Sequence, residues 1–230
     1  FMAEWKWDGI RVQAVSEGGT RRLYSRTGDD ISRTFPDILA AMHFEGAMDG
    51  ELLVRDAGGS VAPFSALQQR LNRKTVSAKL VRDHPAFIRA YDLLRDGDED
   101  IRALPLPQRK QRLAALVGAL PADRFDLSEP LSFTSLDELQ NLRENPPQAV
   151  IEGVMVKRLD SAYVAGRPKG LWFKWKRDPH VVDAVLLYAQ RGHGKRSGYY
   201  SDYTFGVWRG DELVPVGKAY FGFTDEELKR

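Results

Sequence analysis

The chain has 230 residues, and its 34 basic and 32 acidic side chains leave a net charge of +2, which by itself does not indicate a nucleic-acid partner. It contains no cysteine, which excludes disulfides, cysteine zinc sites and a thiol nucleophile within these residues. No apolar run approaches the roughly 20 residues that span a bilayer, and no signal-peptide pattern opens the chain. These features fit a cytoplasmic protein.

The first three quarters of the chain are predicted to form strands joined by tight turns, with helices between them. Residues 10–15 and 22–25 flank Glu17-Gly18-Gly19-Thr20, which indicates a hairpin. Apolar spacing and capping residues such as Ser135 predict the helices. We expect further strands over 47–54, 87–94, 150–158 and 171–177, and helices over 65–71, 107–120 and 135–143. This mixture predicts an α+β fold of antiparallel sheets flanked by helices.

Asp178-Pro179 marks a predicted domain boundary. Beyond it, a strand over 181–189, a glycine-rich basic loop over 191–198 and a hairpin over 203–220 are typical of the first half of a small antiparallel barrel. We therefore expect two domains, residues 1–178 and 179–230. Because the chain starts within a predicted strand and stops at a predicted helix start, we also expect a piece of a longer protein.

The segment Lys6-Trp7-Asp8-Gly9 places a lysine at the end of a strand, directly before a turn. A lysine amine is a nucleophile only without its extra proton, and burial and neighbouring cations favour that state. A strand end followed by a turn could fix the amine over a bound phosphate. An exposed lysine at a strand-to-turn transition fits the same four residues, so the interpretation depends on the rest of the chain.

Carboxylates and an aromatic ring recur on three further predicted strands. Asp49 and Glu51 are two residues apart, so both face the same side of their strand. Tyr91 interrupts an aliphatic strand and is followed by Asp92, and Glu152 lies where another apolar strand begins. Such carboxylates suit a divalent cation, and the ring offers a face to a base.

Lys174 and Lys176 also lie two apart on a predicted strand, with Trp172 on their side and Phe173 and Trp175 on the other. Like charges side by side on a strand repel one another unless an anion lies between them. The pair favours a phosphate site, although two exposed lysines on an edge strand fit it too. With the amine, the carboxylates and the ring, these cations provide what nucleotidyl transfer requires, namely positioning and charge neutralisation.

Taken in order, the five segments resemble the nucleotidyltransferase motifs of ATP-dependent DNA ligases, and the bacterial group most closely. That group also leads us to expect the segment Phe64-Ser65-Ala66-Leu67-Gln68-Gln69-Arg70, which is present. The resemblance implies an adenylation domain of the nucleotidyltransferase, ATP-grasp-like kind over residues 1–178. It implies a truncated, N-terminal part of an OB-fold domain over residues 179–230.

The resemblance also implies a role for each matching residue, with ATP and Mg²⁺ as cofactors and nicked duplex DNA as the partner of a monomeric enzyme. Lys6 matches the lysine that becomes bonded to AMP, and Arg26 an arginine at the 5′-phosphate of the nick. The remaining matches are Glu4 near the adenine, Arg11 holding the nucleotide, Glu51 at the ribose and a metal, Tyr91 stacked on adenine, Glu152 at a metal, and Lys174 and Lys176 at the α-phosphate.

The implied activity is a three-step sealing reaction, in which the lysine takes AMP from ATP, AMP passes to the 5′-phosphate, and the 3′-hydroxyl displaces AMP. An RNA ligase or a GTP-using mRNA capping enzyme would use the same fold and lysine. A non-catalytic module could instead bind nucleic acid through the basic loop over 191–196. The family's sixth, basic motif and its upstream DNA-encircling domain are not found in these residues.

Overall fold

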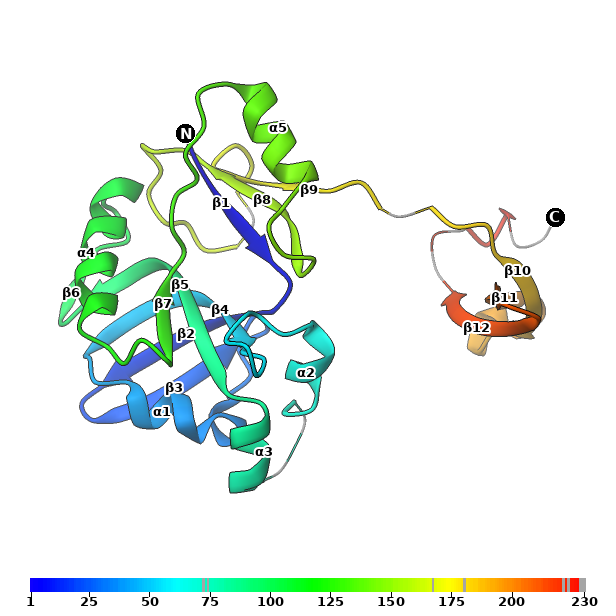
Figure 1. The fold of residues 1–230 in the computed structure, drawn as a ribbon, viewed down its shortest axis with the longest axis horizontal. Helices are drawn as coiled ribbons and strands as arrows, with labels where there is room; N and C mark the ends of the chain where they lie inside the picture. The colour runs from blue at the N-terminus through cyan, green and yellow to red at the C-terminus, as the bar shows by residue number, and fades with distance from the viewer. Residues whose placement is uncertain are drawn as a thin grey trace. The chain divides into compact units, whose positions relative to one another are not determined.

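The computed structural model describes residues 1–71, 73, 75–166, 168–179, 181–220, 222 and 224–227, and it divides the chain into two compact units (Figure 1). The first unit is Phe1–Arg177 and the second is Asp178–Arg230. Antiparallel pairing dominates both units, as the sequence predicts. Among the described residues, no helix is long and apolar enough to cross a membrane.

The larger sheet of the first unit has six strands in the order β3-β2-β4-β5-β6, with β7 added parallel to β5. The predicted hairpin is its β2-β3 pair, and Gly18 and Gly19 turn the chain there with positive φ angles of 56° and 78°. The strands are β2 (Ile10–Glu17), β3 (Thr20–Ser25), β4 (Gly46–Val54), β5 (Ala86–Asp96), β6 (Glu99–Asp100) and β7 (Phe125–Leu127).

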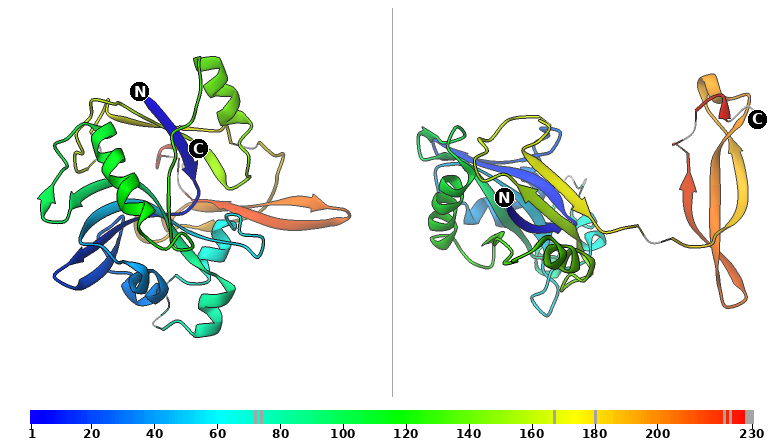
Figure 2. Two further views of the ribbon diagram at one scale, coloured as in Figure 1. Left: turned by 60° about the vertical axis from the view of Figure 1, so that its left-hand side comes forward. Right: turned by 90° about the horizontal axis from the view of Figure 1, so that it is seen from above.

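One face of this sheet carries the main hydrophobic core of the unit. Val12, Met48 and Ile88 point into that core, where they meet Phe35 near α1 and Leu113 of α4. Figures 1 and 2 show the helices of this core beside the sheet. The helical segments around the sheet are η1 (Ser32–Thr34), α1 (Pro36–Ala41), α2 (Phe64–Gln68), α3 (Ala78–Asp83) and α4 (Leu106–Gly118).

A second sheet, in the order β1-β8-β9, completes the first unit. Its strands are β1 (Met2–Trp7), β8 (Ile151–Lys157) and β9 (Trp172–Lys176), and α5 (Leu136–Glu144) covers its outer face. Ser135 caps α5 by accepting from the Glu138 backbone N–H at 3.1 Å, as predicted. Leu139 packs there on Ala3 and Val154. Each sheet therefore has one face on a helix-covered core and the other face free to line a site.

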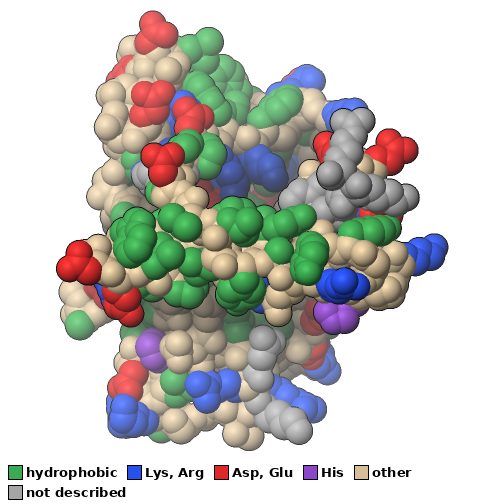
Figure 3. Space-filling view, turned by 90° about the vertical axis from the view of Figure 1, so that its right-hand side faces the viewer, with side chains coloured by type: hydrophobic (Ala, Val, Ile, Leu, Met, Phe, Trp, Pro, Cys, Tyr) green, Lys and Arg blue, Asp and Glu red, His purple; other side chains and the backbone are tan. Residues whose placement is uncertain are grey.

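The second unit contains a three-stranded antiparallel sheet, β10 (Val185–Arg191), β11 (Tyr200–Arg209) and β12 (Glu212–Ala219), with η2 (Gly194–Arg196) in the basic loop. Large apolar side chains remain exposed on it, including Leu186, Tyr188 and Trp208. Figure 3 shows hydrophobic side chains gathered across this sheet. The predicted cap at the C-terminal end forms, since Thr224 and Glu227 exchange hydrogen bonds, while residues 228–230 of the expected helix lie outside the described part.

Candidate active site

A cavity of about 1190 Å³ lies between the two sheets of the first unit. On β2, β4 and β5 most of its lining comes from odd-numbered residues, such as Arg11, Glu51 and Tyr91, and intervening residues such as Val12, Leu52 and Ala90 lie in the core. This is the two-residue period of a strand buried on one face. The cavity brings together all the residues that the sequence assigns to the site, namely Glu4, Lys6, Arg11, Arg26, Glu51, Tyr91, Glu152, Lys174 and Lys176.

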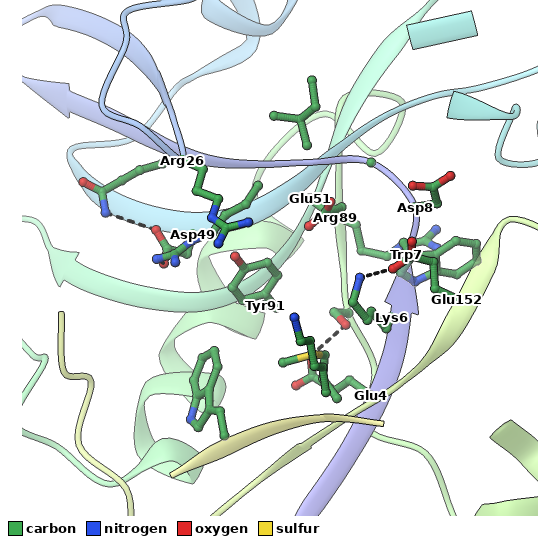
Figure 4. A pocket seen from close by; sticks show the side chains of 18 of the residues that line it. Glu4, Lys6, Trp7, Asp8, Arg26, Asp49, Glu51, Arg89, Tyr91 and Glu152 are labelled. Atoms are coloured by element: carbon green, nitrogen blue, oxygen red, sulfur yellow. Dashed lines mark hydrogen bonds and ion pairs between the residues drawn. The ribbon is translucent and has the colours of Figure 1, made fainter. Parts of the chain in front are cut away.

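Lys6 lies at the end of β1 and contacts the Glu152 carboxylate in a short ion pair (Figure 4). Met155 and Lys157 line the cavity, so strict alternation along β8 would turn Glu152 away from it. A register shift in the β1-β8 pairing, where Lys6 faces Gly153 but Trp7 faces Ile151, brings Glu152 into the site. The nearest charged partner of the proposed nucleophile is thus a carboxylate, whereas the sequence led us to expect neighbouring cations.

Lys174 and Lys176 both line the cavity from β9, on the same side as Trp172. The Lys176 ammonium lies 3.1 Å from Glu152, so one carboxylate bridges Lys6 and Lys176. Lys174 has no hydrogen bond or ion pair with any residue of the described part. The prediction that the two lysines lie on the same face of β9 is confirmed. The Glu152 carboxylate lies between Lys176 and Lys6.

Three carboxylates gather around Lys6, contributed by Asp8, Glu51 and Glu152. Burial raises the pKa of Glu51 to about 7, with the negative charges of Glu152 and Asp8 adding to the rise and Lys6 opposing it. Burial and Glu152 also raise the pKa of Asp8. Against burial, hydrogen bonds from Lys6 and Lys176 lower the pKa of Glu152. Glu51 therefore changes charge near neutral pH, whereas Glu152 stays ionised.

The aromatic wall of the cavity is built from Tyr91 of β5 and Trp172 of β9. Their ring centroids are 6.3 Å apart at an interplanar angle of 74°. The Lys157 ammonium lies 4.3 Å from the Trp172 centroid and 4.8 Å from that of Tyr91. Figure 4 places Lys6 and Glu152 on one side of Tyr91 and Arg26 and Asp49 on the other. In this view the ring therefore lies between these two groups of charged residues.

Glu4 is almost fully buried at the floor of the cavity, where it meets two buried lysines. Its Oε2 accepts from Lys157 at 2.9 Å and from the Ser128 hydroxyl at 2.8 Å, while the Lys110 ammonium lies 3.0 Å from Oε1. Burial alone would raise the pKa of Glu4, but the two lysines outweigh it and lower that pKa. The sequence predictions missed Lys110 and Lys157, because a lysine in a helix or at a strand end is ordinarily at the surface.

Arg11 does not reach freely into the cavity, because two neighbours hold it. Its Nη2 donates to Asp49 at 2.6 Å and to the Tyr163 hydroxyl at 2.7 Å, and that hydroxyl donates to Asp49 at 2.8 Å. Tyr163 comes from the connection between β8 and β9, and no motif pointed to it. Asp49, whose role the sequence left open, thus orients a cation and anchors this connection to the larger sheet.

Arg26 follows β3, lines the cavity rim and has an exposed side chain with no hydrogen bond or ion pair among the described residues. Arg70, the last residue of the segment that the resemblance led us to expect, does not reach the cavity. It is fully buried and donates to both oxygens of Asp37 and to the Thr34 carbonyl. That segment, which contains α2, is therefore tied to α1 through Arg70 and Asp37, and only Arg26 of these two arginines is free to meet a ligand.

Known proteins resemble this chain in sequence and in fold. The profile of the ATP dependent DNA ligase domain matches residues 1–176. A probable DNA ligase of Koribacter versatilis is 37% identical over 99% of this chain and 43% of its own length, and one of Streptomyces coelicolor is 36% identical over 98% and 44%. A mycobacterial DNA ligase D, solved in complex with ATP and MES, covers 99% of this chain and 69% of its own at 27% identity and a TM-score of 0.62.

The fold extends to more distant structures, since a Lig E DNA ligase is 20% identical with a TM-score of 0.71, over 99% of this chain and 80% of its own. The match along the whole first unit decides the class: the chain belongs to the ATP-dependent DNA ligase family. It spans less than half the length of the curated relatives that it matches. Their names do not favour the RNA ligase and capping-enzyme alternatives.

Proposed function

We propose that this chain carries the self-adenylating site of an ATP-dependent DNA ligase and that Lys6 is the residue that becomes bonded to AMP. The observation that carries the proposal is the position of Lys6. It lies at the end of β1 and lines the same cavity as Tyr91, Glu51 and Lys174. An amine, a ring for a base, a carboxylate for a ribose and a cation for a phosphate all face one space.

In the proposed step, the neutral amine of Lys6 attacks the α-phosphorus of ATP. A phosphorus–nitrogen bond forms, the bond from the α-phosphorus to the bridging oxygen breaks, and pyrophosphate leaves with the electron pair. Lys174 and Lys176 stabilise the negative charge that develops on the α-phosphate oxygens. Glu152, which contacts Lys6 in the free protein, orients the amine and accepts its proton or passes it to solvent.

The carboxylates of this site fit a Mg²⁺ ion that is bound jointly by the protein and the substrate phosphates, rather than by protein side chains alone. No group of three or more metal-binding side chains with suitable geometry occurs in the described part of the chain. The negative charge of Glu152 nevertheless raises the pKa of Glu51, so the two carboxylates interact electrostatically beside Lys6. One or two carboxylates plus substrate phosphates are the usual ligands of Mg²⁺. These two residues would hold the ion, which when bound supplies charge neutralisation at the phosphates.

The later steps require DNA, and we propose that Arg26 contacts the 5′-phosphate of a nick. Its guanidinium is unpaired among the described residues and lies at the cavity rim, where a second substrate would approach. The whole protein would then seal nicked duplex DNA as a monomer, in the cytoplasm where bacterial DNA lies. Relatives more than twice as long as this chain support the view that further segments take part in these steps.

The proposal is tested by intact mass after the full-length protein is incubated with ATP and Mg²⁺. Wild type should gain the mass of AMP, and Lys6→Ala should gain none while still binding ATP, because the base and ribose contacts remain. Lys174→Ala and Lys176→Ala should adenylate at least tenfold more slowly, and exposed Lys79→Ala should react at the wild-type rate. An AMP adduct on Lys6→Ala would refute the assignment of the nucleophile.

A further inference from the structure

Arg11 and Glu51 lie directly opposite each other on neighbouring strands, yet no ion pair joins these two described residues. Their Cα atoms are register partners in the β2-β4 ladder, and both side chains line the cavity. Opposite charges that face each other across two strands ordinarily attract. The Arg11 guanidinium instead bonds at 2.6 Å to Asp49, its diagonal neighbour and the register partner of Gln13. Two acceptors beside Arg11, the Asp49 carboxylate and the Tyr163 hydroxyl, account for this choice.

The Tyr163 hydroxyl completes a closed network on Arg11. It accepts from Arg11 Nη2 at 2.7 Å and donates at 2.8 Å to Asp49 Oδ2, the same oxygen that Nη2 contacts. Burial and the negative charge of Asp49 raise the pKa of Tyr163, so the hydroxyl keeps its proton and can donate. Each of the three groups therefore contacts the other two. Arg11 can turn toward Glu51 only by breaking both of its hydrogen bonds.

Tyr163 belongs to a part of the β8-β9 connection that is itself fixed by hydrogen bonds. Its backbone N–H donates to the Arg102 carbonyl at 2.7 Å. Two residues earlier, the Ser161 carbonyl accepts from the fully buried Arg109 of α4 at 2.8 Å. These contacts attach the connection to α4 and to the turn before it, so they hold the hydroxyl in place independently of the groups in the cavity.

The network leaves one edge of Arg11 and the carboxylate of Glu51 available to a ligand. Within the described part of the chain, Arg11 Nε and Nη1 have no hydrogen-bond partner, and the side chain is 44% exposed. Glu51 accepts from the Gly9 backbone N–H and has no ion pair in that part of the chain. A donor edge beside an acceptor suits a pair of neighbouring hydroxyls, because a hydroxyl both donates and accepts.

We propose that Tyr163 is a positioning residue that keeps Arg11 away from Glu51, so that both side chains bind the two hydroxyls of the ribose. The inference rests on the proposed nucleotide site and adds to it a residue outside every sequence motif. If Arg11 turned to Glu51, the two groups would satisfy each other, and the hydroxyls would lose their partners. Loss of the Tyr163 hydroxyl should therefore weaken recognition of the sugar more than the chemical step at Lys6.

The test compares ATP with 2′-deoxy-ATP and 3′-deoxy-ATP in the full-length protein. Adduct formation, followed by intact mass over a range of nucleotide concentrations, gives kcat and KM for each nucleotide. In Tyr163→Phe, kcat/KM for ATP should fall at least tenfold, mainly through KM. The wild-type preference for ATP over the deoxy analogues should shrink at least threefold, because each analogue already lacks one of the hydroxyls. Tyr188→Phe, which removes an exposed hydroxyl from β10, should leave rates and preferences unchanged.

A merely structural role for Tyr163 would slow all three nucleotides alike, so unchanged preferences in Tyr163→Phe would overturn the inference. Tyr163→Leu also removes the hydroxyl and should show the same loss of preference, which keeps the test open if the first variant does not fold. In an Arg11→Ala background, Tyr163→Phe should change the preferences less than twofold, because Tyr163 acts through Arg11. An undiminished further loss would contradict the positioning role and show that Tyr163 contacts the nucleotide itself.

The two proposals fail in distinguishable ways. If wild type gains no adduct with ATP, the proposed function fails before any preference is measured. If wild type is adenylated but does not prefer ATP over either analogue, or if Tyr163→Phe keeps the wild-type preferences, the nucleotidyl transfer stands and only the role of Tyr163 is lost.

Discussion

Glu51 is a carboxylate whose charge near neutral pH depends on its place in the cavity. It lies among Asp8, Glu152 and Lys6, and burial is the largest contribution to its elevated pKa of about 7. Its ordinary pKa is 4.5. Since the folded protein disfavours the ionised form, Glu51 contributes fully to stability below about pH 4.5 and loses that contribution as the pH rises through 7.

Glu51→Gln should remove this loss, because an amide does not ionise. Unfolding in urea at several pH values should show wild type losing about 1–3 kcal/mol relative to Glu51→Gln between pH 4.5 and 8, following the size of the shift. Exposed Glu129→Gln is the control and should track wild type. Parallel curves for wild type and Glu51→Gln would show that the Glu51 carboxyl titrates normally in the folded protein.

At the scale of single residues, the sequence predicted which side chains share the site but not how they pair. Glu51, Lys174 and Lys176 follow from strand periodicity, which depends only on local geometry. Lys6 was predicted from the turn that follows it, and Tyr91 from its place in an aliphatic strand. The approach of Glu152 to Lys6 depends on a register shift between strands about 145 residues apart in sequence, and spacing within one strand cannot reveal it. Lys110 was missed for a similar reason, since only tertiary packing shows that a helix buries it.

At the scale of strands and turns, motif glycines hold the two sheets close to the cavity. A Cβ on Gly9 would lie 2.6 Å from the Leu52 carbonyl oxygen and 2.9 Å from the Cγ of Glu51. One on Gly153 would lie 2.3 Å from the Trp175 carbonyl oxygen, at a φ of 146° that other residues rarely adopt. Gly9 therefore lets the turn after Lys6 lie against β4, and Gly153, next to Glu152, lets β8 lie against β9.

Gly9→Ala should push the turn after Lys6 away from β4, because the nearest obstacle is a backbone oxygen that cannot rotate aside. We expect a loss of about 1–3 kcal/mol in the free energy of unfolding, the usual result of overpacking. Adenylation should slow as well, since Lys6 moves relative to Glu51. Gly118→Ala, in open space at the end of α4, should be neutral or slightly stabilising. Equal stability of both variants would contradict the tight approach.

Long elements were predicted more accurately than short ones, although the strand expected over 181–189 is observed as Val185–Arg191. The strands 47–54 and 150–158 match β4 and β8 to within one residue at each end, because alternation and flanking turns mark them. The short helices α1 and α3 and the parallel strand β7 were not predicted. Each has only three to six residues. Contacts with the large sheet, which their own sequences do not encode, hold α1 and β7, whereas α3 buries none of its residues and so has no apolar face to predict it.

At the scale of the whole molecule, a variant at Arg26 should distinguish the proposed reaction with ATP from the proposed reaction with DNA. In the full-length protein, Arg26→Ala should leave self-adenylation within about threefold of wild type and slow nick sealing at least tenfold, because a charge-assisted phosphate contact is lost. Gel assays with a nicked duplex follow sealing, and intact mass follows adenylation. Arg22→Ala, which alters a cation of β3 that is paired with Asp30, is the control.

If self-adenylation in Arg26→Ala fell as far as sealing, Arg26 would belong to the nucleotide site rather than to the DNA surface. The same assays with the two units expressed together and separately would show which steps need residues beyond Arg177.

The bridge from Lys6 through Glu152 to Lys176 gives two cations of the cavity a counter-ion from the protein itself. An incoming triphosphate would not simply add to these two cations, because it would have to displace a carboxylate that already pairs with both of them. A small anion such as inorganic phosphate gains little from that exchange, whereas a nucleotide has its base and ribose contacts to drive it. The internal carboxylate would thus disfavour small anions at Lys6 and Lys176 relative to a complete nucleotide.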